Sequence, residues 1–148
     1  MEHSRVLGAL AALAFGCAVA GCTPSVYPKD RGFEEMLKTT KDIALGRGFS
    51  RKHGQASGYL DSRQTNVSWF DLEADQDFLF VGLCGPACSD LDLEVFDSEG
   101  FVLAGDTLDD NIPIIELRPD QGGRFSVGAR MIICDREPCV FAYGVYRK

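Results

Sequence analysis

The sequence predicts a mainly β protein: an antiparallel, jelly-roll-like β-sandwich of seven to eight strands, preceded by a short N-terminal helix. From about Gly58 onward, short runs of β-branched and aromatic residues recur, many with alternating polarity. Clusters of turn-forming residues separate these runs, and no helical pattern lies between them. Short strands at this spacing, without intervening helices, are typical of two antiparallel sheets packed face to face.

The first 21 residues are expected to be a signal peptide. Arg5 precedes Val6 to Gly21, an uncharged, Ala-rich run of sixteen residues, whereas a membrane span needs about 20 apolar residues. The run ends in Val19-Ala20-Gly21-Cys22, which resembles the bacterial lipobox, in which the cysteine receives the lipid, palmitate included, and becomes the mature N-terminus. Cys22 is therefore the predicted lipidation site.

Two further residues bear on this processing. Cys17 is a poorer lipidation candidate, because Phe15 stands where a small residue is wanted. Thr23, rather than Asp, follows Cys22, which favours the outer membrane, with the protein facing the periplasm or the cell surface. An ordinary cleaved signal with an incidental cysteine, or an uncleaved anchor, is the alternative.

The rest of the chain divides into a tether, a helical region and the sandwich. Residues 22–29 form the tether, because Pro24 and Pro28 prevent regular helix. Residues 30–57 combine a helix that ends near Gly46 with a basic, Gly-rich surface loop. The helix carries an apolar stripe that is expected to pack on the main domain, with a membrane-surface helix as the alternative. Residues 58–148 form the β-sandwich domain.

The expected strands follow in chain order. They span residues 65–72, 78–83, 91–96, 101–104, 112–117, 124–133 and 140–146. The clearest unit is a hairpin through the four-residue turn Asp97 to Gly100. Among the aromatic residues, Trp69, Phe141 and Tyr143 are expected in the core or in cross-strand packing, whereas Tyr146 has the opposite phase and is expected to be exposed.

Four cysteines remain after signal removal and Cys22 lipidation. We favour the local disulfides Cys84–Cys88 and Cys134–Cys139, because each pair brackets a Pro-containing turn and exported proteins oxidise their thiols. A four-cysteine zinc site is the alternative.

Charge is distributed unevenly along the chain. The formal net charge is −7, and residues 71–120 hold fourteen acidic and one basic side chain. An acidic chain argues against a nucleic-acid partner, which would require a basic surface.

The acidic residues of one expected strand are the candidate binding residues. Asp90, Asp92 and Glu94 alternate with Leu91, Leu93 and Val95, which places three carboxylates on one face. This face is interpreted as a solvated, aggregation-resistant surface. The alternative is a calcium site, whose possible ligands are Asp90, Asp92, Asp106, Asp109 and Asp110. A third possibility is pairing of these acids with Arg118, Arg124 or Arg130.

Residues from about 58 to 148 resemble the bacterial pre-peptidase C-terminal domain. The similar features are the strand and turn from Asp90 to Gly100, the acidic loop Asp106 to Asp110 with the later Pro113, and the Gly123 to Val127 strand. The resemblance implies a jelly-roll sandwich, found beside secreted proteases and as a stand-alone exported module. Some related domains bind calcium or fibrous proteins through acidic loops. No peptidase domain accompanies these residues in this sequence.

No catalytic residues are predicted. After processing, His53 is the only histidine, and no Gly-x-Ser-x-Gly motif is present. The sequence therefore predicts a lipid-anchored cell-envelope protein with a non-catalytic binding or structural module. Its expected partners are the membrane, through the lipid, and an envelope protein or glycan, and no cofactor other than calcium is expected. The alternatives are a calcium-stabilised adhesion or structural domain and an accessory domain to a secreted hydrolase.

Overall fold

The computed structural model describes residues 31–148. The predicted signal peptide, Cys22 and the tether lie outside the described residues. The helix is α1 (Arg31–Gly46). The strands are β1 (Arg51–Leu60), β2 (Thr65–Leu72), β3 (Phe78–Cys84), β4 (Cys88–Phe96), β5 (Val102–Asp106), β6 (Ile114–Leu117), β7 (Gly123–Cys134) and β8 (Cys139–Arg147).

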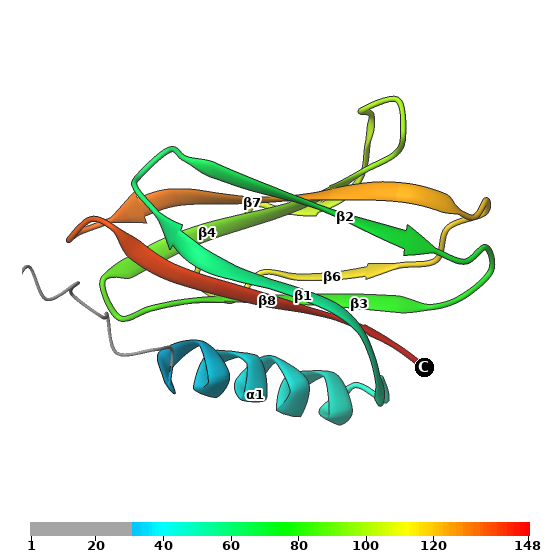
Figure 1. Ribbon diagram of the computed structural model, residues 1–148, viewed down its shortest axis with the longest axis horizontal. Coiled ribbons are helices and arrows are strands. Elements are labelled where there is room, and N and C mark those ends of the chain that lie inside the picture. Colours follow the sequence, from blue (N-terminus) through cyan, green and yellow to red (C-terminus); the bar gives the residue numbers. More distant parts are fainter. Residues whose placement is uncertain (1–30) are drawn as a thin grey trace, which may run out of the picture.

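The eight strands form two four-stranded antiparallel sheets that face each other. Sheet A has the order β1-β8-β3-β6, and sheet B has the order β2-β7-β4-β5. Figure 1 shows the two sheets as stacked layers with the helix beneath sheet A. The predicted class, an antiparallel sandwich of seven to eight strands with one preceding helix, is confirmed.

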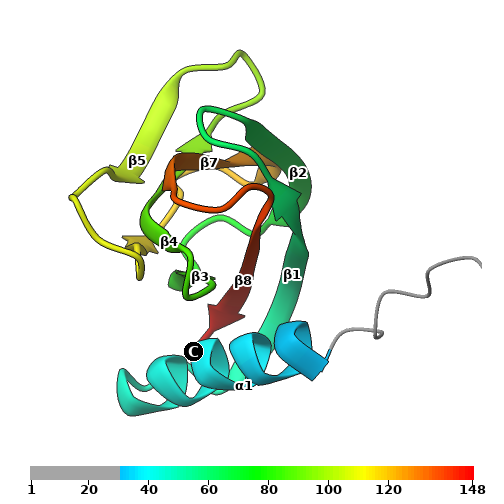
Figure 2. The ribbon, with the colours of Figure 1, turned by 90° about the vertical axis from the view of Figure 1, so that its left-hand side faces the viewer.

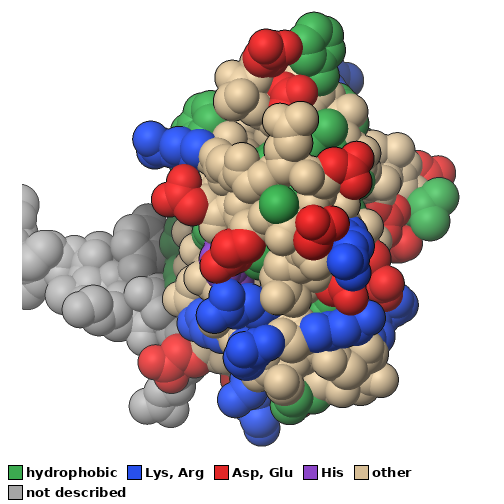
Figure 3. Space-filling view, turned by 90° about the vertical axis from the view of Figure 1, so that its right-hand side faces the viewer, with side chains coloured by type: hydrophobic (Ala, Val, Ile, Leu, Met, Phe, Trp, Pro, Cys, Tyr) green, Lys and Arg blue, Asp and Glu red, His purple; other side chains and the backbone are tan. Residues whose placement is uncertain are grey.

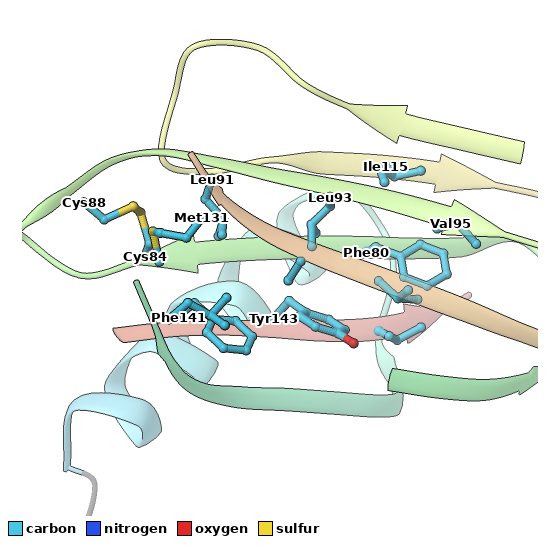
Figure 4. Packing of buried hydrophobic residues seen from close by; sticks show 14 of the residues in the cluster. Phe80, Cys84, Cys88, Leu91, Leu93, Val95, Ile115, Met131, Phe141 and Tyr143 are labelled. Carbon is cyan, nitrogen blue, oxygen red and sulfur yellow. A yellow bond between two sulfur atoms is a disulfide. The ribbon is translucent and has the colours of Figure 1, made fainter. Parts of the chain in front are cut away.

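The main core lies between the sheets. Both sheets contribute inward-pointing side chains, and those that are fully buried include Phe80, Leu93, Val127, Phe141 and Tyr143. Figure 4 shows Phe80, Leu93 and Tyr143 converging from their strands on this interior. The predicted burial of Phe141 and Tyr143 is confirmed.

Helix α1 covers the outer face of sheet A (Figure 2). A second apolar cluster joins the helix and its C-terminal turn to β3 and β8, and consists of Ala44, Phe49, Leu79, Val81 and Tyr146. A buried hydrogen bond between the hydroxyls of Thr40 and Tyr146, 2.8 Å long, joins the same elements. The helix therefore packs on the domain, as predicted. No helix in residues 31–148 is both long enough and apolar enough to span a bilayer.

The burial of Tyr146 contradicts one expectation from the sequence. It was expected to be exposed, but it is only 2 % exposed. Its phase does point out of the sandwich, as predicted, yet helix α1 covers that face of sheet A and buries the ring.

The region around His53 corrects another expectation. Residues 46–58 were expected to form a surface loop, but Arg51–Leu60 is strand β1, paired along its length with β8. The glycines of this strand permit close approach by aromatic rings. A Cβ on Gly54 would lie 2.4 Å from the Phe70 ring, and one on Gly58 would lie 3.2 Å from the Phe141 ring. The sandwich therefore begins several residues earlier than Gly58.

The hairpin between β4 and β5 forms as predicted. The Gly100 amide donates to the Asp97 carbonyl (3.2 Å). The Asp97 carboxylate accepts hydrogen bonds of 2.9 Å from the amides of Glu99 and Phe101. Gly100 has φ 89°, the left-handed region that favours glycine.

Both predicted disulfides are present, and each joins the two sheets. Cys84–Cys88 connects β3 of sheet A to β4 of sheet B, and Cys134–Cys139 connects β7 of sheet B to β8 of sheet A. Cys88 lies opposite Cys134 in the β4–β7 pairing. The two bridges therefore close the same end of the sandwich. Because all four sulfur atoms are in disulfides, none is available as a zinc ligand.

Candidate functional site

No helix covers the outer face of sheet B in the described residues, because α1 packs on sheet A. Alternation along β2 directs Thr65, Val67, Trp69 and Asp71 outward, and all four are exposed. Trp69 retains 51 % of its surface. A large aromatic side chain on an uncovered sheet is typical of interaction surfaces rather than of structural packing.

A row of outward side chains crosses all four strands of sheet B. Trp69 of β2 pairs with Ser126 of β7, which pairs with Phe96 of β4, and Phe96 pairs with Val102 of β5. Apolar groups therefore lie on both sides of the small Ser126. We call Val67, Trp69, Phe96, Val102 and Ser126 the sheet B face.

Gly128 leaves space for the Phe96 ring beside this row of side chains. Gly128 follows Ser126 by two residues on β7, and a Cβ there would lie 3.2 Å from the Phe96 ring. The ring of Phe96 therefore lies over Gly128 and is half-buried. Trp69 has no such cover, so it is the more accessible of the two aromatic rings.

Two arginines add positive charge to the face. The Arg124 guanidinium lies 5.3 Å from the centre of the Trp69 ring, a cation–π arrangement that orients both side chains. Arg130 is opposite Thr65 on one side and Asp92 on the other. The surface thus combines an exposed indole, aliphatic groups and arginine, a composition that is common at binding interfaces.

The position of Trp69 corrects the expectation that it belongs to the core. The stretch from Thr65 to Leu72 has apolar residues in both phases, since Val67 and Trp69 alternate with Phe70 and Leu72. The structure turns Phe70 and Leu72 inward. No signal in this stretch alone distinguishes the two phases.

A groove of about 590 Å³ opens at the end of the sandwich opposite the disulfides. It lies between the β4–β5 hairpin and the β6–β7 loop, with Leu103, Leu117 and Phe125 among its apolar lining. Arg118 and Arg124 are its basic lining residues. Figure 3 shows this end of the molecule, where acidic and basic side chains lie interspersed.

Ion pairs occupy many of the charged groups at this end. Arg118 lies 3.5 Å from Asp77, which also accepts Lys148 at 3.1 Å. The hydrogen bond from Lys148 is the main cause that lowers the pKa of Asp77. These pairs are largely exposed, so they position side chains more than they stabilise the fold.

The acidic strand differs from the predicted solvated surface. Asp92 and Glu94 are half-buried and Asp90 is only 5 % exposed. The β5–β6 loop crosses β4 there, and the Leu91 amide donates to the Asp110 carbonyl (3.0 Å). This crossing removes Asp90 from water.

Asp90 is a buried carboxyl group with one oxygen that lacks a partner. Its Oδ1 has no hydrogen-bond partner in the described residues. Burial, and then the nearby charges of Asp109 and Asp110, raise the pKa of Asp90. Burial also raises the pKa of Asp92, and the positive charge of Arg130 partly offsets this increase. The other arginines considered from the sequence lie elsewhere, since Arg118 pairs with Asp75 and Asp77 and Arg124 contacts Trp69.

Two of the possible calcium ligands already accept hydrogen bonds from backbone amides. Both carboxylate oxygens of Asp106 are bonded to backbone amides, of Leu108 and Ile114, and Asp110 accepts from the Ile112 amide. Within residues 31–148, no three His, Cys, Asp or Glu side chains are grouped so that they could hold a metal ion. Calcium binding by these acids stays a prediction.

Asp90→Asn should distinguish a buried charge from a metal ligand. A carboxyl group with a raised pKa destabilises the folded state at neutral pH, and this penalty falls as the pH drops through the raised pKa toward the ordinary value of 3.8. The substitution should therefore raise the free energy of unfolding at pH 7 by about 1 kcal/mol, with a smaller gain at pH 5. Urea unfolding at both pH values, in calcium and in chelator, measures this. Exposed Asp120→Asn is the control, and a loss of stability in calcium alone would instead identify Asp90 as a ligand.

His53 has a structural contact. Its Nε2 lies 2.7 Å from the Asp71 carbonyl oxygen, and its ring packs against Phe78 at 5.0 Å. This contact joins β1 to β2 and places His53 against a backbone group rather than a nucleophile.

Comparisons with known proteins support the fold. No family model and no curated protein matches the sequence. The pre-peptidase C-terminal domain of a collagenase from Bacillus anthracis is similar in structure, with a TM-score of 0.51 and 9 % identity over 64 % of this chain and 89 % of that domain. PliG from Aeromonas hydrophila, a periplasmic inhibitor of g-type lysozyme, gives a TM-score of 0.49 with 13 % identity over 66 % of this chain and 88 % of its own. The collagenase domain confirms the fold that the family resemblance implied.

Proposed function

We propose that the protein is a lipid-anchored, non-catalytic binding module of the cell envelope that recognises a protein or glycan through the sheet B face. The observation that carries this proposal is the contrast between the two outer faces. Helix α1 covers sheet A, whereas sheet B presents the exposed Trp69 beside Arg124. Exposed aromatic and arginine side chains are the groups most often found at binding hot spots.

The residue chemistry supports a role without catalysis. Four cysteines are in disulfides, and the His53 ring nitrogen contacts a backbone carbonyl. The net charge of −7 argues against nucleic acid as the ligand.

Lipidation at Cys22 would keep the domain close to a membrane. Eight residues lie between Cys22 and Arg31, where α1 begins, so the distance between these two residues is at most about 30 Å. Two disulfides also fit an oxidising compartment outside the cytoplasm.

Cys22→Ser should abolish lipid attachment. Cells fed radiolabelled palmitate should label the wild-type chain and Cys17→Ser, but not Cys22→Ser. The unlabelled variant should also move from the detergent phase to the aqueous phase on phase separation. Label retained on Cys22→Ser would contradict the proposed anchor.

Capture from detergent-solubilised envelopes tests the binding role. The immobilised wild-type chain should retain one partner in near-stoichiometric yield, and sugar arrays test the glycan alternative. Recovery of background proteins alone, with no array signal, would contradict the proposal.

A further inference from the structure

Within the described residues, no ion pair neutralises the buried carboxyl group of Asp90. This residue is 5 % exposed, and its Oδ1 has no hydrogen-bond partner in residues 31–148. The charged side chains that shift its pKa are Asp109 and Asp110, and both raise it because they are negative. A charge that is shielded from water without a partner is costly to the fold, and a positive charge brought close to it reduces that cost.

The carboxylates around Asp90 lack counter-ions as well. Asp92 follows on β4, and Asp109 and Asp110 lie on the β5–β6 loop. None of these three forms an ion pair within residues 31–148. The positive charge of Arg130, opposite Asp92 on β7, counteracts only part of this negative charge. The surface over the start of β4 is therefore strongly acidic.

Two exposed aliphatic side chains flank this acidic surface. Ile133 of β7 lies opposite Asp90 and is 47 % exposed. Leu108, on the β5–β6 loop, is 67 % exposed. The loop runs along the side of β4 away from β7, where the Leu91 amide donates to the Asp110 carbonyl (Figure 4). The two aliphatic side chains therefore lie on opposite sides of β4, two strand spacings or roughly 10 Å apart.

We propose that this surface binds a segment of another protein that presents an arginine or lysine between apolar side chains. We call the surface the Asp90 site, and it consists of Asp90, Asp92, Leu108, Asp109, Asp110 and Ile133. The cationic group of the partner lies against the carboxylates, and its apolar side chains pack on the two aliphatic groups. Such a segment supplies the missing positive charge and covers exposed apolar surface in one contact.

The Asp90 site goes beyond the recognition proposed for the sheet B face. The two surfaces share no residue. Asp90 and Phe96 stand near the two ends of β4, roughly 20 Å apart. A partner at one surface therefore leaves the other surface accessible.

Charge selects a cationic protein over other occupants of this site. Anionic lipid headgroups and nucleic-acid phosphates are repelled by the four carboxylates. A second copy of this chain carries a net charge of −7, which opposes its approach to an acidic surface. A metal ion requires converging ligands, and no three His, Cys, Asp or Glu side chains in residues 31–148 are grouped in that way. A guanidinium or ammonium group needs no such convergence, because it can pair with one carboxylate at a time.

Titration of the full chain, in non-ionic detergent, with a synthetic peptide of alternating arginine and leucine tests the site. The wild-type chain should bind this peptide about tenfold more tightly than the same peptide with neutral citrulline in place of arginine. Asp109→Asn removes an exposed charge and Leu108→Ser an exposed apolar group, and each should weaken binding about fivefold.

Two matched variants control for net charge and for exposed apolar surface. Asp120→Asn neutralises an exposed acid of the β6–β7 loop, and Leu45→Ser changes a side chain of α1 that is 47 % exposed. Neither should alter the affinity for the arginine peptide. Equal weakening by Asp109→Asn and Asp120→Asn would mean that only the net charge attracts the peptide, which would overturn the proposal. Equal affinity for the arginine and citrulline peptides would overturn it as well.

A second measurement locates the bound cation. Carbon NMR of the Asp90 carboxyl group should show that the arginine peptide lowers its raised pKa, because a nearby positive charge favours the ionised form. An unchanged pKa in the saturated complex would place the cation elsewhere and refute the assignment. Failure of this site is distinguishable from failure of the proposed function, because Trp69→Ala and palmitate labelling test residues outside it.

Discussion

Removal of both disulfides is expected to lower the free energy of unfolding by about 4 kcal/mol, since each short loop contributes about 2 kcal/mol in the chain-entropy treatment. The sequence separations are 4 residues for Cys84–Cys88 and 5 for Cys134–Cys139. Short loops restrict the unfolded chain only modestly, but each bridge here also fixes one sheet to the other. The four half-cystines are buried, so their loss also affects packing at that end.

Urea unfolding of the paired variants measures the two contributions. Cys84→Ala with Cys88→Ala, and Cys134→Ala with Cys139→Ala, should each cost about 2 kcal/mol. Because Cys88 and Cys134 are neighbours in the β4–β7 pairing, a combined loss that departs from about 4 kcal/mol measures the coupling between the two bridges. Addition of reductant to the wild-type protein should reproduce the combined loss. A total loss under about 1 kcal/mol would mean that the apolar core alone holds the sheets together.

The alternating strands could be predicted from the sequence because their pattern reflects a buried and an exposed side. Strand β1 could not, since its first eight residues, Arg51 to Gly58, are charged, polar, small or glycine and carry little intrinsic strand preference. Its extended conformation comes from pairing with β8 and from the space that Gly54 and Gly58 leave for aromatic rings. Such a strand is specified by its neighbours.

The opposite errors for Trp69 and Tyr146 have one cause. Both residues point out of the sandwich, one from sheet B and the other from sheet A. The apolar stripe of α1 predicts that the helix will cover a sheet, but it does not indicate which one. Docking on sheet A buries Tyr146 and leaves Trp69 in solvent.

The exposure of the carboxylates on β4 could not be predicted from the sequence pattern either. Alternation correctly separates Leu91, Leu93 and Val95 from the carboxylates. Whether the carboxylates meet water depends on the path of the β5–β6 loop, which contacts Leu91 through Asp110. The burial of Asp90 is therefore a property of the tertiary structure.

Trp69→Ala is expected to weaken binding of the captured partner or glycan at least 30-fold while leaving the fold intact. Truncation of an interfacial tryptophan commonly costs 2 kcal/mol or more of binding free energy, which corresponds to about a 30-fold loss of affinity. The indole is half-exposed, and the Arg124 guanidinium lies over its ring. Its removal should therefore change the unfolding free energy by no more than about 0.5 kcal/mol.

Tyr59→Ala provides the matched control for this loss. Tyr59 is an aromatic residue of similar exposure, 47 %, on β1 of sheet A. Titration of each variant against the captured partner or glycan, with urea unfolding in parallel, separates an effect on the binding surface from an effect on stability. If Tyr59→Ala loses binding and Trp69→Ala does not, the interaction surface belongs to sheet A. If Trp69→Ala unfolds instead, the indole stabilises the fold, and its exposure is no longer evidence that the sheet B face binds a partner.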